Sequence, residues 1–157
     1  MKKIILTIAL AATTGIAAFA ADGGNKTTGE DKVSSTTLNQ FTNDFSNATN
    51  VVWTADKNTE KVTFTRGGEQ LTAFYNHAGE FLGTTQSIAF TAIPYYAQED
   101  ITAAYKGYTV ADVVKYESNG DPSIAPIAYF VDLKKADSEV IIKVINEQKI
   151  AVFKTVK

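Results

Sequence analysis

The sequence predicts an α+β fold of two tandem helix-plus-four-strand units, with an antiparallel sheet and the helices packed on one face. The first observation is that apolar residues at helical spacing precede a run of alternating strands over about residues 36–86. The second is that the same order of elements recurs over about 95–156. Each helix has one apolar face and must bury it against the sheet. A single irregular α+β domain without internal symmetry is the alternative.

The first unit opens with a helix, because four apolar residues at spacings of three or four share one helical face: Leu38, Phe41, Phe45 and Ala48. Thr37 is expected to cap this helix, with Gln40 completing a capping box. Trp53 lies on the strand that follows and is expected in the core. Three further strands are separated by turns at 66–69 and 76–79, where glycine supplies a positive φ.

The second unit begins at Ile93-Pro94, and its helix is predicted from residues that share one face: Ala97, Ile101, Ala104 and Tyr105. Glu99 and Asp100 are expected in the first helical turn, where the helix dipole favours negative charge. Gly107 is expected to end the helix. A polar loop at 118–123 separates the first two of four predicted strands, which run over about 108–117, 126–135, 139–146 and 149–156.

The N-terminus has the pattern of a secretory signal peptide over residues 1–20, with two lysines, an uncharged apolar stretch and a small-residue cleavage site. This stretch is too short for a membrane span. We therefore expect a periplasmic or secreted protein without stable membrane insertion after cleavage, with an uncleaved anchor as the alternative. Residues 21–35 have no apolar period and are predicted to form a disordered leader. The folded domain is then 36–157, with pseudo-repeats over about 36–90 and 91–157.

Composition and charge exclude several classes of function. Cysteine is absent, which excludes thiol catalysis and cysteine-based metal sites. The chain has 15 basic and 17 acidic residues, and two of the basic ones lie in the signal. Without the signal, 13 basic and 17 acidic residues give a net charge of −4. Both signs are interspersed along the chain, so nucleic acid is not expected as a partner.

No group of residues forms a catalytic or metal-binding constellation. His77 is the one histidine, and it lies in a predicted turn without a second ligand nearby in sequence. Adjacent Glu99 and Asp100 point about 100° apart on a helix and make a poor acid–base pair. The sequence also has no nucleophile elbow, phosphate loop or dinucleotide motif. We therefore expect no enzyme, no metal and no cofactor.

A series of short motifs along about residues 38–156 matches a known family in order and spacing: Phe45-Ser46-Asn47-Ala48 with Val51 and Trp53, the hairpin at 73–81, Ile93-Pro94, and Tyr105-Lys106-Gly107-Tyr108. These motifs resemble the PepSY-like, β-lactamase-inhibitor-like domains. The chain departs from the family at Ser46, where proline is frequent, and at Gln148-Lys149, where the family's second hairpin usually has glycine. The resemblance implies periplasmic or secreted proteins of Gram-negative bacteria, a helix-backed antiparallel sheet, and no settled activity.

Exposed aromatic residues are the predicted binding site, because tyrosine is enriched at protein interfaces. Tyr75 lies on a strand beside Phe74, and Tyr95 and Tyr96 lie in the connection between the units. Several strands are apolar on both sides, as at Ile141-Ile142. We expect a non-enzymatic binding or inhibitor-like module that contacts another protein through the helix-free sheet face. The alternative for these tyrosines is that they only cover the sheet edge. The alternative function is that the protein carries or senses a small ligand in a pocket between sheet and helices.

Overall fold

The computed structural model describes residues 27–120, 125–145 and 149–156. Its helices are α1 (Ser35–Asp44) and α2 (Tyr95–Ala104), with single 3-10 turns η1 (Glu30–Lys32) and η2 (Phe90–Ala92). The predicted signal peptide at 1–20 lies outside the described residues. The strands, in chain order, are β1 (Thr27–Thr28), β2 (Thr49–Ala55), β3 (Glu60–Arg66), β4 (Glu69–Tyr75), β5 (Phe81–Ser87), β6 (Thr109–Ser118), β7 (Ile127–Lys135), β8 (Ser138–Ile145) and β9 (Lys149–Val156).

The nine described strands form one continuous sheet, and their order in space follows their order in the chain. β1 pairs with β2 in parallel, and every other neighbouring pair is antiparallel. β5 and β6 pair directly from Gly83 with Ser118 to Ser87 with Val114. The predicted fold of two tandem helix-plus-four-strand units is therefore wrong. The physical reason is that a separate first unit would leave the backbone groups of the β5 edge unpaired, and β6 satisfies them.

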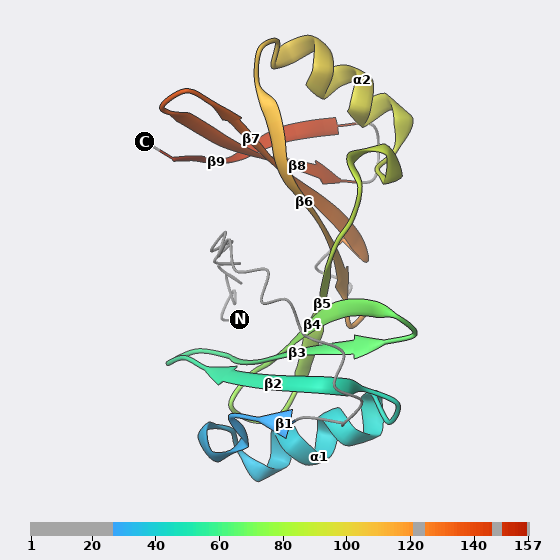
Figure 1. The fold of residues 1–157 in the computed structure, drawn as a ribbon, viewed down its shortest axis with the longest axis vertical. Coiled ribbons are helices and arrows are strands. Elements are labelled where there is room, and N and C mark those ends of the chain that lie inside the picture. The colour runs from blue at the N-terminus through green and yellow to red at the C-terminus, as the bar shows by residue number, and fades with distance from the viewer. Residues whose placement is uncertain (1–26, 121–124, 146–148, 157) are drawn as a thin grey trace.

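The sheet is strongly twisted, with α1 at one end of the molecule and α2 at the other (Figure 1). Thr72, Thr85 and Tyr116 are successive cross-strand partners and point to the same side of the sheet. Ala73 and Val113 point to the opposite side and belong to the cores under α1 and α2. Both helices therefore cover one face. We call the other face, which carries Thr72, Thr85 and Tyr116, the helix-free face.

The first half of the molecule, α1 with β1–β5, has an aromatic core. Phe41 of α1 lies 5.1 Å from the ring of Trp53 and 5.1 Å from that of Phe64, measured between centroids. Phe45 lies 4.7 Å from Phe64. The prediction that Trp53 is a core residue is confirmed, since it is buried with these rings.

The second half, α2 with β6–β9, has an aliphatic core. Ala97 and Ile101 of α2 are buried, which confirms that part of the predicted helical face, whereas Ala104 is exposed. Because α2 begins at Tyr95, Glu99 lies past the first turn, and the predicted dipole role of Glu99 and Asp100 is wrong. The core under α2 contains Ile93, Ala97, Ile101, Val113, Val131, Leu133, Val140, Ile142 and Val144.

The segment before α1 is ordered against the domain, so the predicted disordered leader is wrong over residues 27–35. β1 pairs with β2, and Ser34 is the N-cap of α1. The Ser34 hydroxyl oxygen accepts a hydrogen bond from the Thr37 backbone N–H at 3.2 Å. The cap therefore lies three residues before the predicted cap at Thr37, which is itself buried in the first turn.

The tight turns follow the glycine pattern. In the hairpin between β3 and β4, Gly67 and Gly68 have φ values of 61° and 85°, as predicted. Gly107 follows α2 with a φ of 82°, which also fits the predicted end of that helix. The predicted polar loop at 118–123 lies partly outside the described residues.

Candidate functional site

Tyr75 does not lie on the helix-free face. Its side chain is fully buried under α1, and its hydroxyl donates a hydrogen bond to Asp44 Oδ2 at 3.1 Å. Burial raises the pKa of the Tyr75 phenol, and the Asp44 charge raises it further. The prediction that Tyr75 contacts a partner on this face is wrong, because the strand register turns Tyr75 towards α1 and gives the helix-free side to Phe74.

Tyr95 and Tyr96 lie at the start of α2, whereas Tyr75 lies in the core under α1, and the two helices are at opposite ends of the molecule (Figure 1). Tyr95 is 71% exposed. Tyr96 is half-buried and packs against the aliphatic core. The structure thus does not bring the three predicted binding residues together, and these two lie on the helix side of the sheet.

The helix-free face of the first half is polar. Its side chains are mainly threonines, and Thr63 and Thr72 join their hydroxyls across two strands at 3.1 Å. Val52 and Phe74 are partly buried exceptions. The polar groups of such a surface form hydrogen bonds with water and with one another. The residues on this part of the face include Lys61, Thr63, Thr65, Gln70, Thr72 and Thr85.

The helix-free face of the second half is apolar. Phe153 on β9 is 44% exposed, and its ring packs edge-on against Phe130 with centroids 5.0 Å apart. Lys143 Nζ lies 5.7 Å from the centroid of the Phe130 ring. We call Phe130, Ile141, Lys143, Phe153 and Lys154 the Phe153 patch; the buried cluster on this face consists of Val114, Tyr116, Ala128, Phe130 and Ile141.

Sequence reasoning did not single out Phe153, although one signal was present. Ile141 points to the helix-free face and Ile142 to the α2 core, so the expectation of strands that are apolar on both sides is met there. On β9 the adjacent Phe153 and Lys154 both lie on the helix-free face and break simple alternation, because a β-bulge shifts the register beside Ile141. The Phe153 ring packs against Phe130 on this face.

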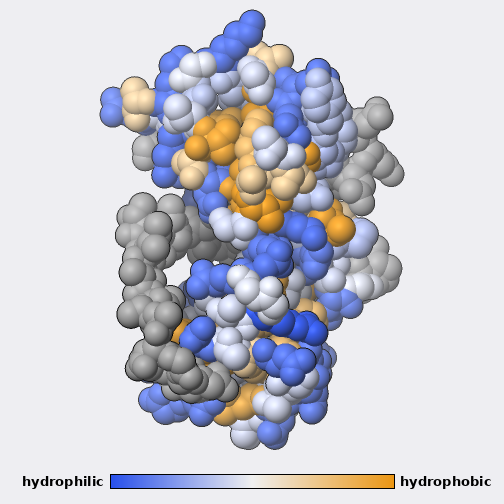
Figure 2. Space-filling model, turned by 45° about the vertical axis from the view of Figure 1, so that its right-hand side comes forward, coloured by the Kyte–Doolittle hydropathy of each residue, from blue (hydrophilic) through white to orange (hydrophobic). Residues whose placement is uncertain are grey.

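Exposed apolar area is concentrated in one half of the molecule. In the space-filling view, the largest apolar area lies over the upper half, which holds α2 and β6–β9 (Figure 2). Among the described residues, the exposed large apolar side chains all belong to this half: Tyr95, Val110, Val152 and Phe153. Apolar surface left exposed in this way is typical of an interaction site.

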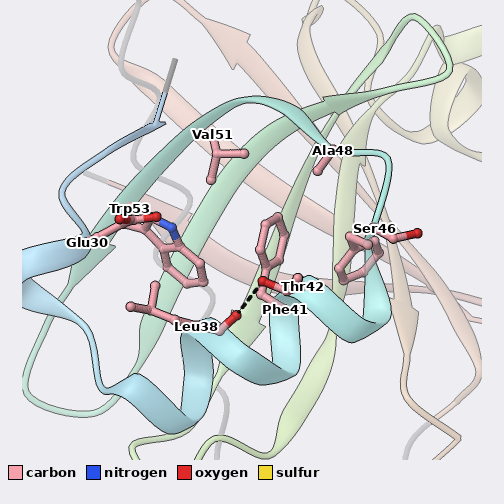
Figure 3. Close-up of a pocket in the computed structure, with 9 residues that line it drawn as sticks. Glu30, Leu38, Phe41, Thr42, Ser46, Ala48, Val51 and Trp53 are labelled. Atoms are coloured by element: carbon pink, nitrogen blue, oxygen red, sulfur yellow. Dashed lines mark hydrogen bonds between the residues drawn. The ribbon is translucent and has the colours of Figure 1, made fainter. Parts of the chain in front are cut away.

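A small hollow of about 200 Å³ lies between α1 and β2 (Figure 3). Thr42 at its rim donates a hydrogen bond to the Leu38 carbonyl oxygen at 2.9 Å. Glu30 is the one charged residue among those that line it. The lining residues are Glu30, Leu38, Phe41, Thr42, Phe45, Ser46, Ala48, Val51 and Trp53.

Glu60 is a buried carboxylate that ties β3 to the start of α1. It accepts hydrogen bonds from the Ser34 backbone N–H at 3.0 Å and the Ser34 hydroxyl at 3.2 Å, and His77 Nδ1 lies 3.4 Å away. Burial favours a raised pKa, but the hydrogen bonds from Thr37, Ser34 and His77 outweigh it and lower the pKa of Glu60. The carboxylate lies between serine and histidine, whereas a nucleophilic triad needs the histidine in the middle.

Asp132 is a buried carboxylate on the helix-free face, 1% exposed. Its Oδ1 has no hydrogen-bond partner among the described residues. Lys134 Nζ lies 3.5 Å from Oδ2 and 3.8 Å from Glu139. Burial and the nearby Glu139 charge raise the pKa of Asp132. Within the described ranges, no three histidine or acidic residues are grouped so as to hold a metal ion.

Comparisons with known proteins identify the class of fold. No family model matches the chain, and no curated protein matches it in sequence. A BLIP-like protein from Bacteroides fragilis has a similar structure, with a TM-score of 0.67 at 16% identity over 82% of this chain and 92% of that one. The BLIP-like name agrees with the inhibitor-like part of the sequence resemblance, and the PepSY-like part finds no counterpart.

Two further Bacteroides structures have the same fold. A DUF2874 family protein from Bacteroides uniformis and a suggested periplasmic protein from Bacteroides eggerthii each give a TM-score of 0.67 at 12% identity, over 79% of this chain and 88% of theirs. These likenesses establish a shared fold. In the part of the chain that the structure describes, no helix is long and apolar enough to span a membrane.

Proposed function

We propose that this protein is a non-enzymatic, extracytoplasmic binding module that contacts another protein through the Phe153 patch. The observation that carries the proposal is the 44% exposed Phe153 ring on the helix-free face, packed against Phe130 and continuous with a buried apolar cluster. An aromatic side chain held in place by its neighbours loses little entropy on binding and often dominates interface energy. Lys143 and Lys154 supply a charged rim.

Three further observations support this proposal. The signal-peptide pattern at 1–20 favours export, and the names of the fold neighbours include a suggested periplasmic protein. The name BLIP-like, given to a neighbour, is that of an inhibitor-like class. The polar helix-free face of the first half offers no comparable apolar anchor.

The test is site-specific photo-crosslinking in cells that export the protein, with the reactive residue at position 153 or at position 110. Val110 is also exposed and apolar but lies on the helix side, which makes it a matched control. We expect an adduct with one protein from position 153 only. For the partner so identified, Phe153→Ser should weaken binding by about 30-fold or more and Val110→Ser should not. Equal crosslinking and equal affinities would eliminate this patch, and turnover by the purified protein would overturn the non-enzyme assignment.

A second candidate function is the binding of a small ligand in the hollow beneath α1. Its volume of about 200 Å³ favours a fragment-sized ligand, because pockets for larger ligands usually measure about 300–1,000 Å³. Trp53 lines the hollow and is the one tryptophan of the chain, so its fluorescence reports occupancy. A ligand that shifts this emission in the wild type and not in Leu38→Phe, where the hollow is filled, would favour this function.

A further inference from the structure

The two edges of the sheet differ in how their strands are paired. At one edge, β1 lies along β2 and pairs with Val51 and Val52. At the other edge, β9 pairs with β8 and with no other described strand. Residues 151–155 of β9 are all exposed. In an antiparallel strand with one neighbour, alternate backbone N–H and C=O groups point away from that neighbour, so β9 presents unpaired groups for a further strand.

The side chains beside this open edge are apolar on both faces. Val152 is 57% exposed and lies on the helix side, since it pairs with Ile142 of the α2 core. Phe153 is exposed on the helix-free face. Natural edge strands are usually protected by charges and bulges. β9 has a bulge and the exposed Lys154, but it leaves these two large side chains accessible to the side chains of an added strand.

The charges around the edge select the kind of strand. β9 contains lysines and no acidic residue. On the helix-free face, Lys154 is exposed, and Lys143 of β8 is the cross-strand partner of Ala151. The nearest acidic residue of β8 is Glu139, which pairs with Val156 at the far end of β9 and lies 3.8 Å from Lys134. A second copy of β9 would place lysines next to lysines, whereas an acidic strand would be attracted.

We infer that β9 accepts an extended acidic segment of the partner protein as an additional strand of the sheet. Main-chain hydrogen bonds would supply affinity, and alternate side chains would contact Val152 on one face and Phe153 on the other. This inference rests on the proposed function, because the Phe153 patch and the open edge share one strand. Beyond that function, the inference specifies that the bound segment of the partner is extended and acidic.

The first experiment measures binding of a labelled synthetic peptide by fluorescence anisotropy. The probe is an extended peptide of about eight residues that alternates aspartate with valine. We expect Lys154→Glu to weaken its binding about fivefold at low salt, since an attraction becomes a repulsion. Lys57→Glu, an equal charge change at an exposed turn in the first half, should leave binding unchanged. Absence of binding, or equal loss in both variants, would overturn the inference.

The second experiment separates strand addition from other modes of contact. A peptide N-methylated at alternate residues keeps its charge and side chains but loses backbone donors, so we expect its binding to fall at least tenfold. The unmodified peptide should slow hydrogen exchange in β9 and leave exchange in β2 unchanged. Unaltered β9 exchange, or equal binding of both peptides, would overturn the inference. So would sedimentation of the wild type as a dimer that Lys154→Glu alters, because the edge would then belong to a second copy.

The outcomes also distinguish this inference from the proposed function. If Phe153→Ser abolishes binding of the crosslinked partner while the N-methylated peptide binds as well as the unmodified one, the patch is correct and the added strand is wrong. If Phe153→Ser leaves binding of that partner intact while β9 exchange still slows with the peptide, the edge is correct and the patch is wrong.

Discussion

The two halves of this molecule, α1 with β1–β5 and α2 with β6–β9, each place one helix on the same face of the sheet but differ in their chemistry. The core under α1 is built from contacting rings, and the core under α2 from aliphatic side chains. The N-cap of α1 is a serine held by a buried carboxylate, whereas the N-cap of α2 is Pro94, which makes no side-chain capping hydrogen bond. The helix-free face is polar in the first half and apolar in the second. The difference shows that, among the described residues, the large apolar side chains left exposed are confined to the half with the aliphatic core.

The largest expected effect comes from the aromatic core. Trp53→Ala should cost about 3–5 kcal/mol, a large part of a typical domain stability of about 5–15 kcal/mol. Because β5 and β6 pair directly, Trp53→Ala and Ile142→Ala in the second half should each shift one common transition. Chemical denaturation followed by circular dichroism would measure this. Two separate transitions would mean that the halves unfold independently.

Gly83→Ala tests the junction between the halves. Gly83 has a φ of 147°, and an added Cβ would lie 2.8 Å from the Tyr116 hydroxyl oxygen and against the Glu117 carbonyl oxygen. We expect a loss of about 1–3 kcal/mol in the free energy of unfolding from strain and overpacking. Gly67→Ala, at a hairpin glycine with open space around it, is the control and should cost less. Equal losses at both positions would contradict a tightly packed junction.

Glu60→Gln tests the cap of α1. The variant should lose about 1–2 kcal/mol at neutral pH, because an amide N–H group would face the Ser34 donors. The pKa of Glu60 is lowered from its ordinary value of 4.5, so its contribution is present above that value and is lost as the pH falls through the lowered folded-state pKa. The loss of unfolding free energy in the variant should therefore be smaller in acid than at neutral pH. Denaturant unfolding of both proteins at neutral pH and in acid would measure it. Exposed Glu80→Gln is the control, and a deficit independent of pH would contradict the cap.

The smallest effect is expected at Asp132, whose carboxylate in the second half behaves in the opposite way. Its pKa is raised from 3.8, so its contribution is favourable below that value and is lost as the pH rises through the folded-state pKa. At neutral pH the buried charge opposes folding, and Asp132→Asn should be neutral or stabilising by about 1 kcal/mol. Exposed Asp137→Asn should change nothing. Clear destabilisation by Asp132→Asn at pH 7 would show that the Lys134 pair contributes net stability.

Local features of the fold were predictable because they depend on neighbouring residues. The strands follow alternating patterns, and the turn at 66–69 follows its glycines. The cap of α1 was not predictable, since several residues before Leu38 can cap a helix. Ser34 is selected by Glu60, which lies 26 residues after Ser34 in the chain and accepts hydrogen bonds from it.

The candidate site was harder to predict than the strands. Alternation places Phe74 and Tyr75 on opposite faces, but only the pairing of β3, β4 and β5 decides which face receives α1. The β5–β6 pairing joins strands separated by a whole helix, so no local pattern encodes it. Phe153 and Lys154 share the face of Phe130 because of a bulge in β9 whose position depends on its partner strand.

The matching order of strands in space and in the chain also determines how this protein is expected to fold. Each strand after β1 can add to a neighbour that has already been synthesised, and only the β1–β2 and β5–β6 pairs of the described sheet must wait for an intervening helix. Contacts of this kind have short sequence separations, which favours fast folding for a sheet of this size. The sheet can therefore grow from its N-terminal end as the chain emerges. Until β9 pairs with it, β8 is the edge strand of the sheet. During that time its residues Ile141 and Ile142 are exposed to incorrect pairing with other chains.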